Sequence, residues 1–343
     1  MKNNIFSMKK IKEFTLENGY PLSVHWAITE SCNLRCTHCY MDKKPQFVSL
    51  EIALEIIRFL KENGFLIVTL SGGECTTHPN FKEIYKALKD AGMIVNIFTN
   101  GTAFNEDILQ LLGQYKPNKV EISIYGKDEE NFYMTTGVKD AFKYFEKNVK
   151  ALKELGIRVL LKAPITKKNF QYLNDFIDIS KENNTEYKFG TFVFPMLTGD
   201  KITLKERLEP EDIVNIEFDD ENNLDMFRKL VKDKGFNKVN FNSKCSSCMN
   251  NFVLNSDCSF SFCGMMIEPK FSFNDYKTIE TAYNDVISYR KKVQKLYEAG
   301  PCSKCENVAY CPGCPAHLML ENGNTNTCNE YFKEVTQLKL SRV

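Results

Sequence analysis

The strongest constraint on the fold is the repeated alternation of short β-rich runs with helical patterns over the first two-thirds of the chain. Runs of β-branched and aromatic residues predict strands, and apolar residues spaced about 3.6 apart predict amphipathic helices between them. Strand-then-helix units predict parallel strands joined by right-handed crossovers. The fold class is therefore α/β, with either a doubly wound sheet or a complete or partial barrel. The predicted strands span residues 22–29, 65–70, 93–99, 119–124, 157–165 and 186–196.

The predicted helices carry recognisable start and stop signals. Ser49 is expected to cap the first helix, and Asn80 is expected to cap the next, which ends at Gly92. Two longer amphipathic patterns predict helices at residues 139–155 and 169–182. The apolar faces of these helices are expected to pack on the sheet.

The regular alternation stops after residue 196. Residues 197–244 are charged and irregular, which predicts a solvated connector. Two later runs, at 252–254 and 259–262, predict a hairpin, and residues 278–299 predict a helix. Because the rest of this region is cysteine-punctuated loop with few apolar residues, bound metal is expected to supply its core. The predicted segments are an N-terminal extension at 1–21, a strand-and-helix domain at 22–196, the connector at 197–244 and a cysteine-rich domain at 245–343.

Composition excludes several classes of protein. With 43% hydrophobic and 26% charged residues, the chain has the composition of a soluble globular protein. Its net charge of +1 and the lack of a basic stripe argue against a nucleic-acid partner. No apolar run approaches the ~20 residues that span a bilayer, so no membrane partner is expected. Because the N-terminus lacks the apolar core of a signal peptide, we expect a cytoplasmic protein.

Cysteine usage divides the chain into two chemical regions. There are 13 cysteines: three between residues 32 and 39, one at position 75, and nine between 245 and 328. None occurs at residues 76–244. In a long chain without an export signal, clustered thiols more often bind metals or catalyse reactions than form disulfides.

The first cluster consists of Cys32, Cys36 and Cys39, on one loop directly after the first predicted strand. Three thiolates can hold three irons of a cubane [4Fe–4S] cluster and leave the fourth iron open to a small ligand. The alternative is a zinc site in which His38 is the fourth ligand. That geometry is awkward, because His38 lies between two cysteines that are only three residues apart.

This C-x-x-x-C-x-x-C loop resembles the radical SAM superfamily, whose members cleave S-adenosylmethionine (SAM). Further residues match the family in order and position. The resemblance covers roughly residues 22–196 and implies a partial (β/α)6 TIM-like barrel, with its site on the loops after the strands. By the resemblance, Gly72, Gly73 and Glu74 would contact the SAM amino group, and Asn100 would follow strand three in the SAM site. Ser123 would contact the ribose, and His38 would pack near the adenine.

The nine C-terminal cysteines demand metal, either as zinc knuckles or as two [4Fe–4S] clusters. Their spacing resembles the SPASM extension of some radical SAM enzymes, which carries two auxiliary clusters. Two features depart from that pattern: two residues, where three are common, separate Cys311 from Cys314, and Cys258 replaces the usual hairpin glycine. Cys258 is therefore a candidate substitute ligand for auxiliary cluster I. By the resemblance, Cys245, Cys248, Cys263 and Cys314 would hold auxiliary cluster I, and Cys302, Cys305, Cys311 and Cys328 would hold auxiliary cluster II.

Cys75 is left without a metal role. A spare buried cysteine usually fills space as a small apolar side chain. Because Cys75 directly follows Glu74, it is also a candidate hydrogen-atom donor to a substrate radical, or a transient carrier of substrate.

The resemblance implies an enzyme with three [4Fe–4S] clusters that reductively cleaves SAM to a 5′-deoxyadenosyl radical and oxidatively modifies a peptide or protein. The preferred substrate is a ribosomally synthesised precursor peptide, which would receive a thioether or carbon–carbon crosslink or a similar change. An electron donor such as flavodoxin or ferredoxin is expected. Because only 31 residues precede Cys32, a peptide substrate is expected either to need a separate leader-peptide-binding protein or to dock directly on the barrel mouth. The alternatives are a sulfatase-maturing formylglycine-generating enzyme, and an iron–sulfur or zinc electron-transfer protein that never cleaves SAM.

Overall fold

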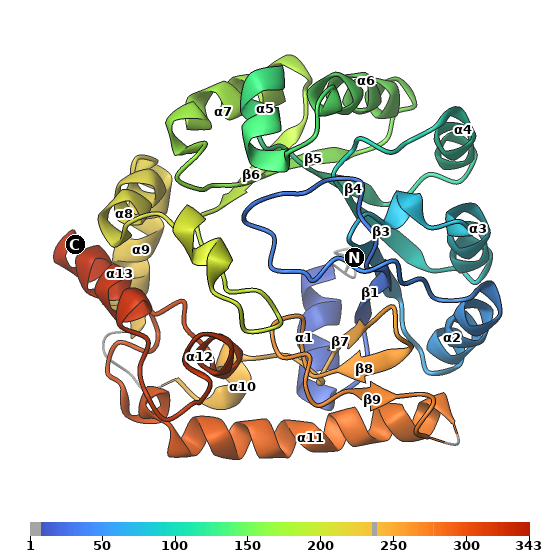
Figure 1. The fold of residues 1–343 in the computed structure, drawn as a ribbon. Helices are drawn as coiled ribbons and strands as arrows, with labels where there is room; N and C mark the ends of the chain where they lie inside the picture. The colour runs from blue at the N-terminus through green and yellow to red at the C-terminus, as the bar shows by residue number, and fades with distance from the viewer. Residues whose placement is uncertain (1–7, 235–238, 277) are drawn as a thin grey trace, which may run out of the picture.

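The computed structural model describes residues 8–234, 239–276 and 278–343 (Figure 1). Its central feature is a nine-stranded sheet with the order β6-β5-β4-β3-β2-β1-β7-β8-β9. The strands from β1 to β6 are all parallel, and each pairs with its neighbour in sequence. They are β1 (Ser23–Thr29), β2 (Ile67–Gly72), β3 (Ile94–Thr99), β4 (Lys119–Ser123), β5 (Val159–Pro164) and β6 (Glu186–Gly190).

This sequential order decides between the two predicted architectures. A doubly wound sheet reverses its strand order at a switch point, whereas these six strands run in one direction, as in a barrel. β6 ends the sheet, so the barrel is open. The predicted partial TIM-like barrel is confirmed. An outer ring of helices covers the strands (Figure 1): α2 (Leu50–Glu62), α3 (Phe81–Asp90), α4 (Glu106–Gln114), α5 (Glu129–Thr136), α6 (Ala141–Glu154) and α7 (Leu173–Glu182).

The two predicted helix caps have different outcomes. The Ser49 side chain caps α2 by accepting a hydrogen bond from the Ile52 backbone N–H at 3.2 Å. Asn80 occupies the cap position of α3, but its side chain makes no capping bond. Its backbone N–H instead donates to Nδ1 of His78 at 3.0 Å. The helix boundary was predictable here, whereas the hydrogen bond was not, because His78 comes from the preceding turn.

The prediction of an irregular connector at residues 197–244 is wrong. The segment contains α8 (Pro210–Phe218), α9 (Glu221–Lys234) and the short α10 (Phe241–Lys244). Ile213 and Val214 are buried on α8, which packs against the C-terminal helix α13 (Glu330–Ser341). The high charge hid a short apolar stripe, although Pro210 at the start of α8 is a recognisable helix signal.

The C-terminal region continues the barrel sheet. β7 (Asn251–Leu254) pairs in parallel with β1, and the predicted hairpin with β8 (Ser259–Ser261) is confirmed. β9 (Phe271–Ser272) ends the sheet. Two further helices, α11 (Ile279–Ala299) and α12 (Pro315–Asn322), complete the region.

Metal is not the sole core of this region, contrary to the sequence-based expectation. The rings of Phe252 and Tyr283 lie 5.0 Å apart, and each contacts barrel residues across the junction. Phe65 lies 5.4 Å from Phe252, and Phe59 lies 5.4 Å from Tyr283. Aromatic residues scattered along the sequence thus converge to form an apolar core that joins the two regions.

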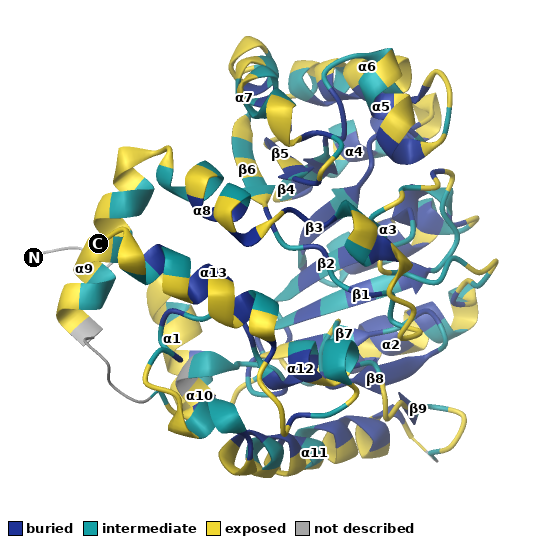
Figure 2. Ribbon diagram, turned by 60° about the vertical axis from the view of Figure 1, so that its left-hand side comes forward, coloured by how far each residue is buried: buried dark blue, intermediate teal, exposed yellow. Residues whose placement is uncertain are grey.

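The N-terminal helix α1 (Met8–Asn18) lies beside this junction (Figure 1). The Asn250 side chain donates to Thr15 Oγ1 at 3.2 Å and to the Lys12 carbonyl at 3.3 Å, which fixes the helix next to β7. Figure 2 shows the buried residues concentrated along the strands and the exposed residues on the outward helix faces. No helix in the described ranges is long and apolar enough to cross a membrane.

Candidate active site

The predicted site residues gather where neighbouring parallel strands end. The cysteine loop follows β1, Gly72 and Gly73 end and follow β2, Asn100 follows β3, and Ser123 ends β4. Because β1, β2, β3 and β4 are consecutive in the sheet, these segments form one continuous edge. In the sequence, up to three α-helices (α2, α3 and α4) separate these segments.

Glu74 joins the ends of β2 and β3. Its side chain is buried, with 1% of its surface exposed. Oε1 accepts hydrogen bonds from Thr76 N at 3.1 Å, Thr76 Oγ1 at 2.6 Å and Thr99 Oγ1 at 2.8 Å, whereas Oε2 accepts one from Asn100 N at 2.6 Å. Burial raises the pKa of Glu74, and these hydrogen bonds oppose that rise. A carboxylate offers about four acceptor directions, so Oε2 retains one for a further donor.

The glycine pair before Glu74 permits close packing of β2 against the start of the cysteine loop. A Cβ on Gly73 would lie 2.3 Å from the Ser31 carbonyl oxygen, and one on Gly72 would lie 2.0 Å from that of Thr29. Gly73 N donates to Thr29 O at 2.9 Å, and Glu74 N donates to Ser31 O at 2.8 Å. The two glycines therefore allow a close contact between β2 and the backbone at the start of the cysteine loop.

Asn100 supports the cysteine loop through a small amide network. Its Nδ2 donates to Asn33 Oδ1 at 2.9 Å and lies 3.9 Å from Cys32 Sγ. Its Oδ1 accepts from Thr102 N at 2.8 Å, and Asn33 Nδ2 donates to Thr102 Oγ1 at 2.8 Å. Sequence reasoning missed Asn33 and Thr102, although each lies within two residues of a predicted site residue.

The three thiols of the loop are half-buried neighbours. Burial raises the pKa of Cys36 to about 12, with Cys39 and Cys32 adding to the rise and Lys43 opposing it. Burial also raises the pKa of Cys32. Lys43 is held in place by donating to the Leu34 carbonyl at 2.8 Å. A nearby cation of this kind favours the thiolate form that binds iron.

His38 and Ser123 flank Tyr125, which sequence reasoning missed. The rings of His38 and Tyr125 lie 5.6 Å apart, and the Tyr125 hydroxyl hydrogen-bonds with Ser123 and Cys36. Burial, followed by repulsion from Lys43 and Lys168, lowers the pKa of His38 to about 4, so the imidazole is neutral at pH 7. Its buried Nδ1 has no hydrogen-bond partner among the described residues.

Cys75 lies in the core below this edge. Its side chain is fully buried, and Sγ donates to the Phe98 carbonyl at 3.4 Å. Burial raises the pKa of the Cys75 thiol well above its ordinary value. These properties favour the packing role among the three that the sequence left open.

The predicted auxiliary ligands fall into two neighbourhoods. In the first neighbourhood, burial raises the pKa of Cys263 to about 12, and the thiols of Cys314 and Cys245 add to the rise. The thiols of Cys263 and Cys245 also add to the raised pKa of Cys248. Burial raises the pKa of Cys302 to about 11, and the neighbouring thiols that add to it are those of Cys311, Cys328 and Cys305.

Cys258 belongs to neither neighbourhood. Burial raises its pKa to about 11, but the neighbouring group that adds to the rise is the Asp257 carboxylate, not another thiol. Its backbone has a φ of 60°, which a glycine would adopt more easily. No three His, Cys, Asp or Glu side chains in the described ranges lie close enough to hold a single metal ion.

The inward face of the barrel carries a polar group that sequence reasoning also missed. His25 Nε2 shares a hydrogen bond of 2.5 Å with Ser71 Oγ, and its ring packs edge-on against Phe98 at 5.5 Å. Burial, followed by repulsion from Lys162 and partly offset by Glu121, lowers the pKa of His25 to about 4. Because every second residue of a barrel strand faces the interior, this alternation is the sequence signal that could have placed His25 and Ser71 inside the barrel.

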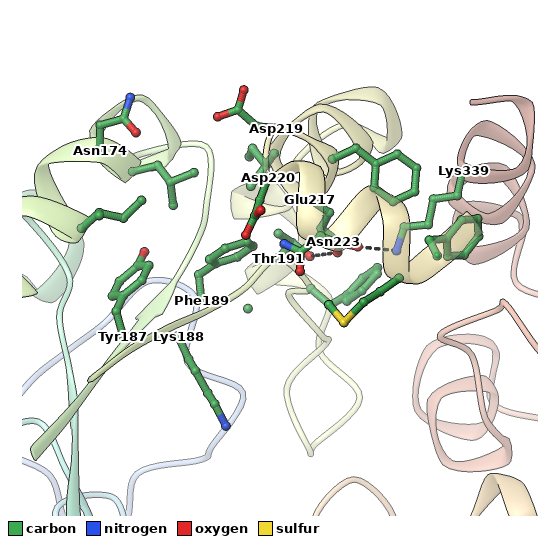
Figure 3. A pocket seen from close by; sticks show the side chains of 18 of the residues that line it. Asn174, Tyr187, Lys188, Phe189, Thr191, Glu217, Asp219, Asp220, Asn223 and Lys339 are labelled. Carbon is green, nitrogen blue, oxygen red and sulfur yellow. Dashed lines mark hydrogen bonds and ion pairs between the residues drawn. The ribbon is translucent and has the colours of Figure 1, made fainter. Parts of the chain in front are cut away.

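A cavity of about 850 Å³ lies apart from these residues, on the outer side of β6 between α7 and the α8–α9 pair (Figure 3). Tyr187, Phe189 and Phe227 line it, and Glu217 crosses it to pair with Lys339 and accept from Thr191. None of the predicted site residues lines this cavity. It flanks the open edge of the barrel.

Comparison with known proteins bears on the segment that carries the strand-end site. Residues 26–181 match the model of the family described as the radical SAM superfamily. This segment, which contains the cysteine loop, is therefore a radical SAM domain. Radical SAM enzymes bind SAM and a [4Fe–4S] cluster, and this radical SAM chain has three thiols on one loop to hold such a cluster.

Among characterised relatives, the subtilosin biosynthesis protein AlbA of Bacillus subtilis is 25% identical over 341 residues, covering 94% of this chain and 75% of AlbA. The sporulation killing factor maturation protein SkfB of the same species is 29% identical, covering 48% of this chain and 40% of SkfB. Most of the other relatives also match only about half of this radical SAM chain.

Solved structures share the fold. Streptococcus suis SuiB bound to its precursor peptide SuiA superposes with a TM-score of 0.69 at 16% identity, covering 97% of this chain and 84% of SuiB. The enzyme anSMEcpe with bound SAM superposes with a TM-score of 0.66 at 17% identity, covering 94% of each chain. The likeness thus extends over the C-terminal region as well as the radical SAM barrel.

Two observations fit the superfamily's cofactors to this site. The loop offers three thiols, so a cubane held there keeps one iron open for the amine and carboxylate of SAM. The site also contains one buried polar atom without a hydrogen-bond partner among the described residues, His38 Nδ1, and Glu74 Oε2 can accept a second hydrogen bond besides the one from Asn100. A nucleoside with an amino-acid tail could satisfy both kinds of group.

Proposed function

We propose that this radical SAM enzyme oxidatively modifies a ribosomally synthesised precursor peptide, by forming a thioether or carbon–carbon crosslink or a similar bond. One observation carries the proposal: the three-thiol loop lies at the carboxyl edge of a barrel that is open beside β6. SuiB, which shares this fold, is solved with a precursor peptide bound, so the fold can accept a peptide chain. Similarity to AlbA, a bacteriocin biosynthesis protein, over 94% of the chain supports the same substrate class.

We assign the roles at the strand edge by residue. Cys32, Cys36 and Cys39 would hold the cluster, which supplies the electron that cleaves SAM to methionine and a 5′-deoxyadenosyl radical. Glu74 would orient the SAM amino group through Oε2 while it fixes Asn100 by their 2.6 Å hydrogen bond. Gly72 and Gly73 would act indirectly by keeping β2 against the loop. Ser123 would bind the ribose, and His38 with the adjacent Tyr125 would bind the adenine.

Auxiliary clusters are the second part of the proposal. Cys245, Cys248, Cys263 and Cys314 would hold auxiliary cluster I, and Cys302, Cys305, Cys311 and Cys328 would hold auxiliary cluster II. The two thiol neighbourhoods support this division, and they leave Cys258 outside both sets. An auxiliary cluster would accept the electron that an oxidative crosslink releases.

The proposed partners follow from this chemistry. Flavodoxin or ferredoxin in the cytoplasm would supply the electron for SAM cleavage, and a separate protein would bind the leader of the precursor peptide. The second candidate function is sulfatase maturation, which is supported by superposition on anSMEcpe over 94% of both chains.

The first experiment tests for radical SAM chemistry. Reduced protein, reconstituted anaerobically with iron and sulfide, is incubated with SAM and assayed for 5′-deoxyadenosine. A Cys36→Ala variant serves as the matched control. We expect 5′-deoxyadenosine from the wild type alone. Its absence from a wild type with full iron content would leave the electron-transfer alternative.

A second experiment separates the substrate classes. The enzyme is incubated with any short cysteine-rich peptide found to be encoded beside its gene, and separately with a peptide containing a sulfatase active-site cysteine. Mass spectrometry should show loss of two hydrogen atoms per crosslink in the first peptide. Conversion of the sulfatase cysteine to formylglycine, with the first peptide unchanged, would reverse the assignment.

A further inference from the structure

Arg290 on α11 is a buried cation with an unusual set of partners. Its side chain is 9% exposed, and its guanidinium donates to the Ser247 carbonyl at 2.5 Å, the Cys245 carbonyl at 2.7 Å and Asn242 Oδ1 at 2.8 Å. It also lies over the Phe241 ring at 4.7 Å. All of these partners are neutral, and two of them lie in the segment that carries the first auxiliary thiols.

Lys244 is a second cation with neutral partners, and it is half-buried. Its Nζ donates to the Val308 carbonyl at 3.0 Å and to the Cys311 carbonyl at 2.5 Å. Lys244 also directly precedes Cys245 in the chain. It is therefore adjacent to a thiol of the first neighbourhood and bound to the backbone of a cysteine in the second.

Neither cation pairs with a carboxylate. All Asp and Glu residues of the chain lie in the described ranges, and none of the ion pairs found there includes Lys244 or Arg290. Other sheltered cations in this protein do have acidic partners: Arg207 pairs with Glu321, and Lys339 pairs with Glu217. A sheltered cation is stabilised further by a nearby negative charge, and the protein supplies none to these two positions.

We propose that Lys244 and Arg290 are the counter-cations of the auxiliary clusters, with Arg290 serving cluster I and Lys244 serving both. This inference rests on the auxiliary clusters of the proposed function. A cubane with four thiolates is anionic, and it gains one more negative charge on reduction. A fixed cation beside it therefore stabilises the reduced state more than the oxidised state, which raises the reduction potential.

The hydrogen bonds of Arg290 and Lys244 fix each cation beside proposed cluster ligands. Arg290 binds the backbone of Cys245, and Lys244 binds the backbone of Cys311. Each cation is thus fixed to a ligand segment and cannot move away from the cluster on a flexible side chain. Because Lys244 adjoins both sets, it should keep their potentials high together and so favour acceptance of the electron from the substrate.

The test measures potentials directly. In a background with Cys32, Cys36 and Cys39 changed to alanine, only the auxiliary clusters should remain, and EPR-monitored redox titration gives their midpoints. Arg290→Gln should lower one midpoint and Lys244→Met should lower both, whereas Arg290→Lys should retain most of the wild-type value. Lys295→Met, on the exposed face of the same helix, should change neither midpoint.

A second measurement separates charge compensation from a purely structural role. Lys244→Met and Arg290→Gln should lower the thermal stability of the cluster-loaded protein more than that of the chelator-treated protein. Equal losses in both forms, or unchanged midpoints at full iron content, would overturn the inference. Iron analysis shows which proposal fails. About 12 irons per wild-type chain with unchanged midpoints would refute the counter-cation role alone, whereas about 4 irons per chain would also refute the auxiliary clusters.

Discussion

At the scale of single residues, Gly73 and Glu74 fix the cysteine loop to the ends of β2 and β3 through backbone and side-chain hydrogen bonds. The cysteine loop, the glycine pair and Glu74 were recognisable from their spacing, and the structure places them at one edge. The four hydrogen bonds to Glu74 and the Asn33–Thr102 bond could not be predicted. They depend on how loops from separate strands pack against one another, which no local pattern records.

Gly73→Ala should disrupt the site without removing a functional group. The added Cβ would lie 2.3 Å from the Ser31 carbonyl oxygen and 2.6 Å from that of Glu30, so the cysteine loop must shift. We expect a loss of about 1–3 kcal/mol in stability, as for other overpacked sites, with lower iron content and less 5′-deoxyadenosine. Gly190→Ala is the control, since nothing lies within 4 Å of its added Cβ. Equal behaviour of the two variants would refute this account of the glycine.

Because of His25, the free energy of unfolding should fall as the pH decreases below 6.5. Its pKa is about 4 in the folded protein and 6.5 in the unfolded chain. The unfolded state therefore takes up a proton first as pH falls below 6.5, and the stabilisation present at higher pH is lost. The loss should reach about 1 kcal/mol by pH 5.5.

Urea denaturation of the wild type and of His25→Gln at pH 7.5 and 5.5 measures the His25 contribution. The variant should lose less stability than the wild type between these two values. A pH dependence that is the same in both proteins would show that His25 is accessible to protons in the folded state.

At the scale of elements, the six barrel strands and most of their helices were predictable because their apolar periodicity is strong. The helices outside the barrel were not. In α8 and α9 charged residues obscured the apolar stripe, and in α12 and α13 the cysteines drew attention to metal binding. Periodicity also could not choose between a doubly wound sheet and a barrel, because strand order is a property of long-range pairing.

The buried ion pair between Arg207 and Glu321 should be a major attachment of α12 to the segment before α8. The guanidinium binds both carboxylate oxygens, at 2.8 and 2.7 Å, and lies over the Tyr331 ring at 4.3 Å. Arg207→Met would leave the sheltered carboxylate without its paired cation, which should cost about 3–5 kcal/mol in chemical denaturation.

A double variant, Arg207→Met with Glu321→Gln, tests whether the unpaired charge is responsible. It should be more stable than the single variant, because the uncompensated carboxylate has been removed. If the double variant is instead less stable by the sum of both changes, packing rather than charge holds these elements together.

At the scale of the whole molecule, the barrel and the C-terminal region form one sheet, so they should unfold together. The single tryptophan, Trp26, is fully buried on β1 and reports on the barrel. Phe260 is fully buried on β8, where it contacts Phe59 of the barrel helix α2 at 6.2 Å. Phe260→Ala should therefore shift the Trp26 fluorescence transition, with a loss of about 3–5 kcal/mol.

Circular dichroism on the same samples follows the unfolding of the whole molecule, so its transition can be compared with the Trp26 fluorescence transition. Its transition should coincide with that of Trp26 fluorescence if unfolding is cooperative. Tyr144→Ala, at a side chain that is 52% exposed, should change neither transition. A Trp26 transition that is unaffected by Phe260→Ala would mean that the barrel unfolds independently.

The pairing of β1 with β7 also affects how the protein is made. Ser23 and Asn251 hydrogen-bond across 228 residues, so β1 leaves the ribosome long before one of its two neighbours exists. Until Leu254 has emerged, β1 is an unprotected sheet edge of the kind that pairs with other chains. The cysteine loop directly follows β1. Because β1 is not fixed in the sheet until β7 has emerged, we expect iron to be installed in the loop only after synthesis is nearly complete. A translation pause before β7 would lengthen the interval in which the nascent chain is prone to aggregate.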